Sequence, residues 1–253
     1  MQSRSLVPVA KRPIQRVGQF CVSVIARIST FIVYVGCKYF TRTGTTVTAE
    51  GHEQIPAYGA LLFVARHYHH LYDGSILTTI VPRRVHILVA LDWIQSRAVR
   101  IFMDTFCQLA KWPVVLREER LQDSHTKSAF TRDESKRYMR RGITMAVNLL
   151  RDGEALVIFP EAYPNIDPST SPKSGKDEFL PFKPGFVKII EIAERSGKAQ
   201  VAVIPTGFHY VYYEDKKRWD VTVRFGTPVS RTQFTSSQAF AQELEKRVRE
   251  LSH

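Results

Sequence analysis

Short apolar runs recur along this sequence, and segments with helical patterning separate them. The runs are too brief for typical helices and suit strands that are buried on both faces. They are Leu61–Ala65, Val85–Leu91, Ala155–Phe159, Val201–Ile204 and Val221–Phe225. Such an alternation of strands and helices predicts an α/β fold, in which helices cover the faces of a central sheet. We expect one domain after an N-terminal helix, because the sequence contains no internal repeat and no linker-like stretch.

The composition limits the classes of function that the chain can have. Of its 253 residues 44% are hydrophobic, which is enough for a full core. The three cysteines lie far apart and are odd in number, so neither a disulfide framework nor a thiolate zinc site is indicated. The net charge of +12 indicates an anionic partner, such as nucleic acid, an anionic membrane surface or a phosphorylated substrate.

The N-terminal region is both basic and apolar. Residues 1–50 hold seven lysines or arginines and a single acid, Glu50. This combination fits a membrane interface better than a nucleic-acid groove. No nucleic-acid recognition motif accompanies the charge, so we expect a membrane surface and no nucleic acid among the partners. The alternative is a solvated tail followed by a core helix.

The segment Phe20–Phe40 is close to the length of about 20 residues that a bilayer core requires. Arg27 lies near its middle and makes spanning costly. We therefore expect an interfacial or half-inserted helix first, a buried core helix second and a true span last. The predicted division is a membrane-interface helix region over residues 1–44 and a globular domain over residues 45–253. Attachment is expected to be peripheral or half-inserted, at the cytoplasmic face of the cell membrane.

Cap and composition signals place some of the remaining segments. Asp92 is a candidate N-cap for a helix that follows it, and Gly153 fits the end of a helix over Gly142–Leu150. The segment Glu118–Arg141 is dense in charge, which predicts a solvated helical or mobile insertion. Pro164–Pro184 is rich in proline, serine, lysine and aspartate, and predicts a long loop of the kind that often carries function.

A cluster of histidines with a nearby aspartate follows the first buried run directly. Its members are His67, His69, His70 and Asp73. An imidazole takes a proton near neutral pH, and a neighbouring carboxylate fixes its tautomer and stabilises its charged form. The cluster therefore predicts a general base that activates a hydroxyl group. A zinc site built from His67, His69 and Asp73 is the competing interpretation, but it would leave the motifs further along the chain unexplained.

Six short motifs follow one another along the chain, with the histidine cluster between the first two. They are Gly51–Pro56, Pro113–Arg117, Val157–Glu161, Pro181–Gly185, Val203–Pro205 and Val223–Pro228. Each motif alone is weak evidence, but six in this order make chance improbable. From about residue 46 to residue 228, the series resembles the glycerolipid acyltransferases of the 1-acylglycerol-3-phosphate acyltransferase (PlsC-like) family.

The resemblance implies a mixed, largely parallel sheet flanked by helices, and an acyltransferase domain over residues 45–253. It also implies transfer of a fatty acyl group from acyl-CoA or acyl-carrier protein to a hydroxyl of a lysophospholipid, such as 1-acylglycerol-3-phosphate. No metal and no cofactor are implied beyond the thioester co-substrate. In that family a histidine and an aspartate form the catalytic pair. Carried over, the catalytic candidates are His67, His69 and Asp73, and the substrate-binding candidates are Arg117, Glu161, Lys183 and Gly185.

The first departure from the family pattern concerns which histidine is the base. The family places four residues between its histidine and aspartate, and Tyr68 occupies that position here. Counting from the end of the strand favours His67, with one residue inserted before Asp73. Helical geometry favours His69, because residues i and i+4 share one face of a helix. We prefer His69 and keep His67 as the close alternative.

The second departure affects the acceptor. The family typically reads Glu-Gly-Thr-Arg where this chain has Glu161–Pro164, so an arginine expected to bind phosphate is absent. Ala162 is expected to exclude conformations that are open to glycine. Arg66, at a position where the family has asparagine, is a candidate substitute, as are Lys173 and Lys176. These departures motivate two alternatives: a non-catalytic lipid-binding relative, and an acyltransferase whose acceptor carries no phosphate.

Overall fold

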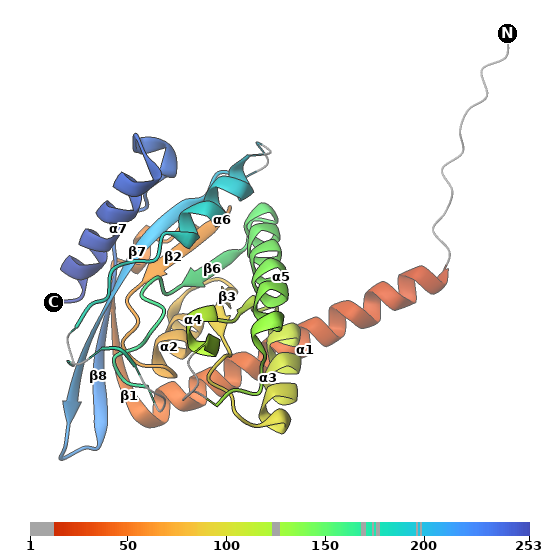
Figure 1. Ribbon diagram of the computed structural model, residues 1–253, viewed down its shortest axis with the longest axis horizontal. Coiled ribbons are helices and arrows are strands. Elements are labelled where there is room, and N and C mark those ends of the chain that lie inside the picture. Colours follow the sequence, from red (N-terminus) through yellow and green to blue (C-terminus); the bar gives the residue numbers. More distant parts are fainter. Residues whose placement is uncertain are drawn as a thin grey trace, which may run out of the picture.

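The structure is a computed structural model that describes residues 13–122, 127–167, 171–173, 175, 178–195, 197 and 199–253. A long helix, α1 (Pro13–Gly44), precedes a sheet whose two faces are covered by helices (Figure 1). The other helices are α2 (Tyr72–Ile80), α3 (Arg97–Ala110), α4 (Glu118–Gln122), α5 (Arg132–Arg151), α6 (Gly185–Glu194) and α7 (Ser237–Leu251). Two short 3₁₀ turns are η1 (His52–Gln54) and η2 (Arg231–Gln233).

The main sheet in the described part of the chain has six strands. Their order is β1 (Thr45–Glu50), β8 (Arg218–Phe225), β7 (Ala202–Tyr213), β2 (Leu61–Ala65), β6 (Ala155–Ile158) and β3 (Val85–Ile87). β2 runs parallel to both β6 and β7, β3 is parallel to β6, and β1 is parallel to β8. The β7–β8 pairing is antiparallel, so β1 and β8 run against the other four. The sheet is mixed and largely parallel, which confirms the predicted fold class.

The apolar runs form strands because both faces of the sheet are covered. All five residues of β2 are fully buried. Leu62 and Val64 lie in a core with residues of α5, α6 and α7. Leu61 and Phe63 lie in a second core with α2 on the opposite face. Because successive strand side chains point to opposite faces, an uninterrupted apolar run is what a strand between two helical layers requires.

Two sequence expectations about the segment after α2 are wrong. The run Val85–Leu91 is divided between β3 and β4 (Val89–Ala90), and β4 pairs with β5 (Val114–Val115) in a separate two-stranded sheet. Asp92 does not cap a helix, since α3 begins at Arg97 after Ser96. Its carboxylate is fully buried and pairs with an arginine from the chain after β5.

The charged segment over residues 118–141 is more ordered than its composition predicts. It supplies α4 and the first half of α5, while residues 123–126 lie outside the described part. Thr131 and Glu134 form a capping box at the start of α5. Glu134 also accepts two hydrogen bonds from Arg100 of α3, at 3.1 and 2.6 Å. Charged side chains of this segment therefore face solvent and also join α5 to α3.

Helix α1 is longer than the apolar segment that predicted it. Its C-terminal half packs on the domain through a stripe of buried residues, and its N-terminal half extends away from the domain (Figure 1). The buried stripe is Ser29, Val33, Cys37 and Thr41. Among the described residues, no helix combines the length and the apolar character needed to cross a bilayer. Residues 1–12, which carry part of the expected basic region, lie outside the described part.

Candidate active site

The candidate site lies where the parallel strands β2 and β6 end. His67 follows β2 in extended chain, and Asp73 is the second residue of α2. The turn between them brings His67 Nδ1 to 3.0 Å from Asp73 Oδ2. The His67 ring stacks on Phe159, which follows β6, at a centroid distance of 4.4 Å. Carboxyl ends of parallel strands are the usual place for ligand sites in α/β folds.

Asp73 is fully buried, and both of its carboxylate oxygens are hydrogen-bonded. Besides His67, Oδ2 accepts the backbone N–H groups of Tyr68 at 2.7 Å and His69 at 3.0 Å. Oδ1 accepts the hydroxyl of Tyr210, in β7, at 2.6 Å. Burial and the adjacent carboxylate raise the pKa of Tyr210 well above its ordinary value, so the phenol stays a donor. These contacts fix the carboxylate and, through it, the His67 ring.

His69 is placed differently from the prediction that preferred it. That preference assumed a shared helix face, but α2 begins at Tyr72, and residue 69 precedes the helix. The His69 ring does not contact the carboxylate; its Nδ1 accepts the N–H of Leu71 at 3.2 Å. Burial lowers the pKa of His69 to about 4, against an opposing effect of Asp73. His70 is exposed, with Nδ1 3.1 Å from the carbonyl oxygen of Ile166.

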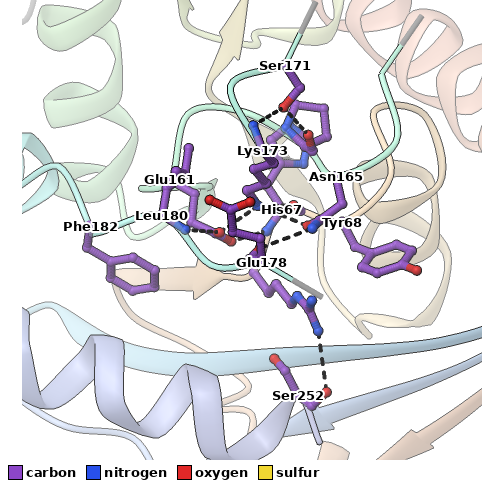
Figure 2. Close-up of polar contacts among 12 residues, drawn as sticks. His67, Tyr68, Glu161, Asn165, Ser171, Lys173, Glu178, Leu180, Phe182 and Ser252 are labelled. Carbon is purple, nitrogen blue, oxygen red and sulfur yellow. Dashed lines mark hydrogen bonds and ion pairs between the residues drawn. The ribbon is translucent and has the colours of Figure 1, made fainter. Parts of the chain in front are cut away.

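Glu161 and Lys173 hold the backbone beside His67. Glu161 Oε1 accepts the N–H of His67 at 2.9 Å, and its Oε2 accepts the N–H of Leu180 at 3.0 Å (Figure 2). Lys173 Nζ lies 2.6 Å from Glu161 Oε2 and donates to the His67 carbonyl at 3.0 Å and to Asn165 Oδ1 at 2.9 Å. Both charged side chains are fully buried.

This buried ion pair fastens the long loop to the candidate site. Burial lowers the pKa of Lys173, and Glu161 opposes the shift. Lys173 is engaged in these contacts, and the interpretation that it replaces the missing phosphate-binding arginine stays a prediction. Lys176, the other candidate in the loop, lies outside the described residues.

Arg117 is also held by the protein. Its Nε and Nη2 donate to the Asp92 carboxylate at 2.8–3.1 Å, and its Nη1 donates to the Ala162 carbonyl at 2.7 Å. Arg120 approaches the same carboxylate, with Nε 3.7 Å from Oδ2. The Arg117 guanidinium lies 4.3 Å from the ring centroid of Tyr163. The guanidinium is thereby positioned against the segment that follows Glu161.

Ala162 contradicts the expectation drawn from the missing glycine. Its φ of 66° lies in the left-handed region, where a side chain costs about 1–2 kcal/mol. The backbone thus adopts a glycine-like conformation although alanine occupies the position. The Ala162 carbonyl that this conformation presents is the acceptor for Arg117.

The remaining predicted residues form no hydrogen bond with the side chains of the His67–Asp73 pair among the described contacts. Arg66 is buried, and its Nη1 donates to the carbonyls of Phe208 at 3.3 Å and Ser252 at 3.4 Å. These hydrogen bonds lie with β7 and the C-terminal residues, and the expected role of Arg66 as a substitute for the phosphate-binding arginine stays a prediction. Lys183 is half-exposed and pairs with Glu119. Gly185 begins α6, and a Cβ there would meet no atom within 4 Å.

Tyr210 and Phe159 are residues of the site that sequence reasoning missed. Tyr210 lies 137 positions after its partner Asp73, within an apolar strand that gives no sign of a polar role.

The described residues contain no group of three histidines, cysteines or carboxylates that could hold a metal ion. The site is therefore built around one imidazole–carboxylate pair, with a second carboxylate and a buried lysine supporting its backbone.

The fold and the site define an acyltransferase. The family model described as Acyltransferase matches residues 46–209, and the chain belongs to this family. Its structure is similar to the crystal structure of the 1-acyl-sn-glycerophosphate (LPA) acyltransferase PlsC from Thermotoga maritima, with a TM-score of 0.50 and 15% identity. The likeness covers 95% of this chain and 82% of that chain. Comparison with curated protein sequences found no match.

Proposed function

We propose that this enzyme moves a fatty acyl group from acyl-CoA or acyl-carrier protein to a hydroxyl of a lysophospholipid, such as 1-acylglycerol-3-phosphate. The observation that carries the proposal is the 3.0 Å contact between His67 Nδ1 and Asp73 Oδ2 in a chain of the acyltransferase family. A histidine held through Nδ1 keeps Nε2 for proton transfer. The His67 side chain is 17% exposed, so it is not sealed from the surface.

The reaction needs one base and no covalent enzyme intermediate. His67 Nε2 takes the proton of the acceptor hydroxyl while the hydroxyl oxygen attacks the thioester carbonyl carbon. The new C–O bond forms, the C–S bond breaks, and the leaving thiolate takes the proton back from the imidazolium. Asp73 orients the ring and stabilises its charged form. We assign the base to His67 and not to His69, because the His69 ring has no hydrogen bond to a carboxylate and burial lowers its pKa to about 4, which makes it a weak base.

We propose that Arg117 meets the acceptor phosphate. A guanidinium has five N–H groups, and the contacts of Arg117 with described residues use one on each nitrogen. The remaining two support a role in binding phosphate oxygens beside the segment that follows Glu161.

An acceptor without phosphate is the second candidate. Pro164 stands where the family has its phosphate-binding arginine. Arg66 donates to the Ser252 carbonyl, and Lys173 pairs with Glu161. The two candidates separate in one assay with labelled acyl-CoA, purified enzyme, and either lysophosphatidic acid or monoacylglycerol in detergent micelles. Preference for lysophosphatidic acid supports the first, and preference for monoacylglycerol supports the second. Lipid binding without turnover of any acceptor would contradict both.

We also propose peripheral attachment to the cytoplasmic face of the cell membrane through the N-terminal region. Residues 13–44 contain four basic residues and no acidic residue. Exposed apolar side chains in the C-terminal half of α1 support an interfacial location. Cell fractionation tests this: extraction by carbonate without detergent is expected, and a requirement for detergent would contradict peripheral attachment.

A further inference from the structure

One side of α1 exposes a continuous apolar stripe. Its members are Ile28, Phe31, Ile32, Val35 and Tyr39, with 46–67% of their surface accessible. They recur at the spacing of one helix face. The buried stripe of α1 faces the domain, so this second stripe is left for solvent or for a partner. Large exposed apolar patches on a soluble surface mark interaction sites.

Helix α3 carries a second stripe of the same kind. Ile101 and Phe102 are each 67% exposed, and Leu109 lies two turns further along the same side. The opposite side of α3 is buried through Cys107 and Ala110. An ordinary surface helix exposes polar residues on the side away from the core. The exposed side of α3 instead carries these three large apolar side chains beside the polar Thr105 and Gln108.

Helices α1 and α3, which carry the two stripes, pack together (Figure 1). Val33 and Cys37 of α1 form a small core with Ala110 of α3. Ser29 Oγ also donates a hydrogen bond to the Leu109 carbonyl at 3.2 Å. An open apolar groove of about 580 Å³ adjoins this contact, lined by residues of α1 and of the chain after α2.

The charges around this surface are those that an anionic bilayer would attract. Helix α1 contains only basic charged residues, and α3 begins with Arg97. The one acid of α3, Asp104, accepts the Tyr138 hydroxyl at 2.8 Å and lies 3.8 Å from Arg100. Two copies of this surface would bring like charges together, whereas a leaflet rich in anionic lipid complements both the charge and the apolar stripes.

We propose that α3 is a second membrane-contacting helix, whose Ile101 and Phe102 enter the interface of an anionic bilayer beside the apolar stripe of α1. The inference extends the proposed peripheral attachment and assigns part of it to a helix within the family domain. Binding through two helices would then fix the orientation of the domain on the membrane. A single helix would leave the domain free to rotate about the helix axis.

The test uses the full-length chain and sedimentation with lipid vesicles. The double variant Ile101→Ser/Phe102→Ser removes the α3 side chains, and the double variant Val211→Ser/Tyr212→Ser removes exposed apolar side chains from the β7–β8 hairpin. With vesicles of phosphatidylglycerol and phosphatidylcholine, the first variant should bind about tenfold more weakly than wild type. The second should bind like wild type, and phosphatidylcholine vesicles alone should bind every form more weakly.

Three outcomes would overturn the inference. One is equal binding of the α3 variant and the wild type, and another is no binding of the wild type to anionic vesicles. The third is a concentration-dependent dimer, seen by sedimentation velocity without lipid, that the α3 variant abolishes. Acyl transfer in detergent micelles is measured in parallel, and thermal unfolding verifies that each variant folds. Unchanged transfer with altered vesicle binding separates this inference from the proposed reaction.

Discussion

Asp73 and Asp92 are both fully buried carboxylates near the ends of the strands, yet their partners differ in kind. Asp92 contacts two guanidinium groups, those of Arg117 and Arg120, which stay charged at every physiological pH. Asp73 contacts an imidazole, two backbone N–H groups and a phenol. The first carboxylate holds two permanently charged side chains in place, whereas the second contacts a side chain that gains and loses a proton in the proposed reaction. Burial alone therefore does not distinguish the carboxylate that we propose to be catalytic; its titratable partner does.

The largest effect is expected from removing the imidazole that makes Asp73 different. His67→Ala should lower kcat by about 10²–10⁴-fold, because a positioned general base contributes that much. His69→Ala should retain more activity, since its ring does not contact Asp73. Initial rates with labelled acyl-CoA measure both, and exposed His70→Ala is the control. A greater loss in the His69 variant than in the His67 variant would remove the basis for the assignment.

The contrast between the two carboxylates is tested directly by Asp92→Asn. Loss of this charge leaves the Arg117 and Arg120 guanidiniums without their counter-ion, and the free energy of unfolding should fall by about 3–5 kcal/mol. Urea unfolding measures the change. The matching variant Asp73→Asn should lose most of its activity with a smaller loss of stability. The reverse pattern, with stability lost mainly at residue 73, would show that the comparison is drawn wrongly.

His69 should make stability fall in mild acid. Its pKa is lowered to about 4 in the folded protein, so below pH 6.5 the unfolded chain binds a proton that the folded chain does not. The free energy of unfolding is therefore highest above pH 6.5 with respect to this group. It falls as pH drops toward 4, by up to about 3 kcal/mol. Urea unfolding at pH 7 and pH 4.5 measures it. His69→Gln should weaken the dependence, and an unchanged dependence would assign it to other groups.

Tyr210→Phe removes one hydrogen bond from Asp73 and leaves the other contacts of the carboxylate in place. A hydrogen bond to a charged group contributes about 1.5–3 kcal/mol, so stability should fall by an amount in that range. The kcat should also fall, because the carboxylate that orients His67 is held less firmly. The exposed phenol of Tyr58 offers a control, and Tyr58→Phe should change neither quantity. A full loss of activity without any loss of stability would instead indicate a direct catalytic role for the phenol.

The smallest effect is expected at Ala162, whose carbonyl links the Asp92 cluster to the segment after Glu161. Ala162→Gly should stabilise the fold by up to about 1 kcal/mol, because glycine adopts its positive φ without a side-chain cost. The gain is reduced by the greater freedom of glycine in the unfolded chain. A shift of the thermal midpoint upward by a few degrees would agree. A clear decrease would mean that the alanine methyl group makes contacts that outweigh the strain.

Much of the fold could be predicted because it depends on local pattern. Runs such as Leu61–Ala65 and Ala155–Phe159 are apolar at every position, and burial between helical layers follows from that alone. The prediction that Asp92 caps a helix is wrong, because an aspartate suited to a helix cap is equally suited to an ion pair. Its partner Arg117 is 25 positions away, so the local sequence gives no sign of that pair. The charged residues 118–141 are helical and largely exposed where they are described, as one of the two predicted alternatives had it. The contact of Glu134 with Arg100 of another helix could not be predicted from this segment alone.

By itself, the sequence determined that strands and helices alternate, that a histidine cluster with an aspartate follows a buried strand, and that the motif order matches an acyltransferase. Only the tertiary structure decided that the His67 ring meets Asp73, that Glu161 and Lys173 support the backbone beside it, and that Arg66 turns toward the C-terminus. The physical reason is distance along the chain: Tyr210, Lys173 and Glu161 lie about a hundred residues from their partners. Local pattern fixes which face of an element is buried, and only the packing of distant elements fixes which polar groups meet there.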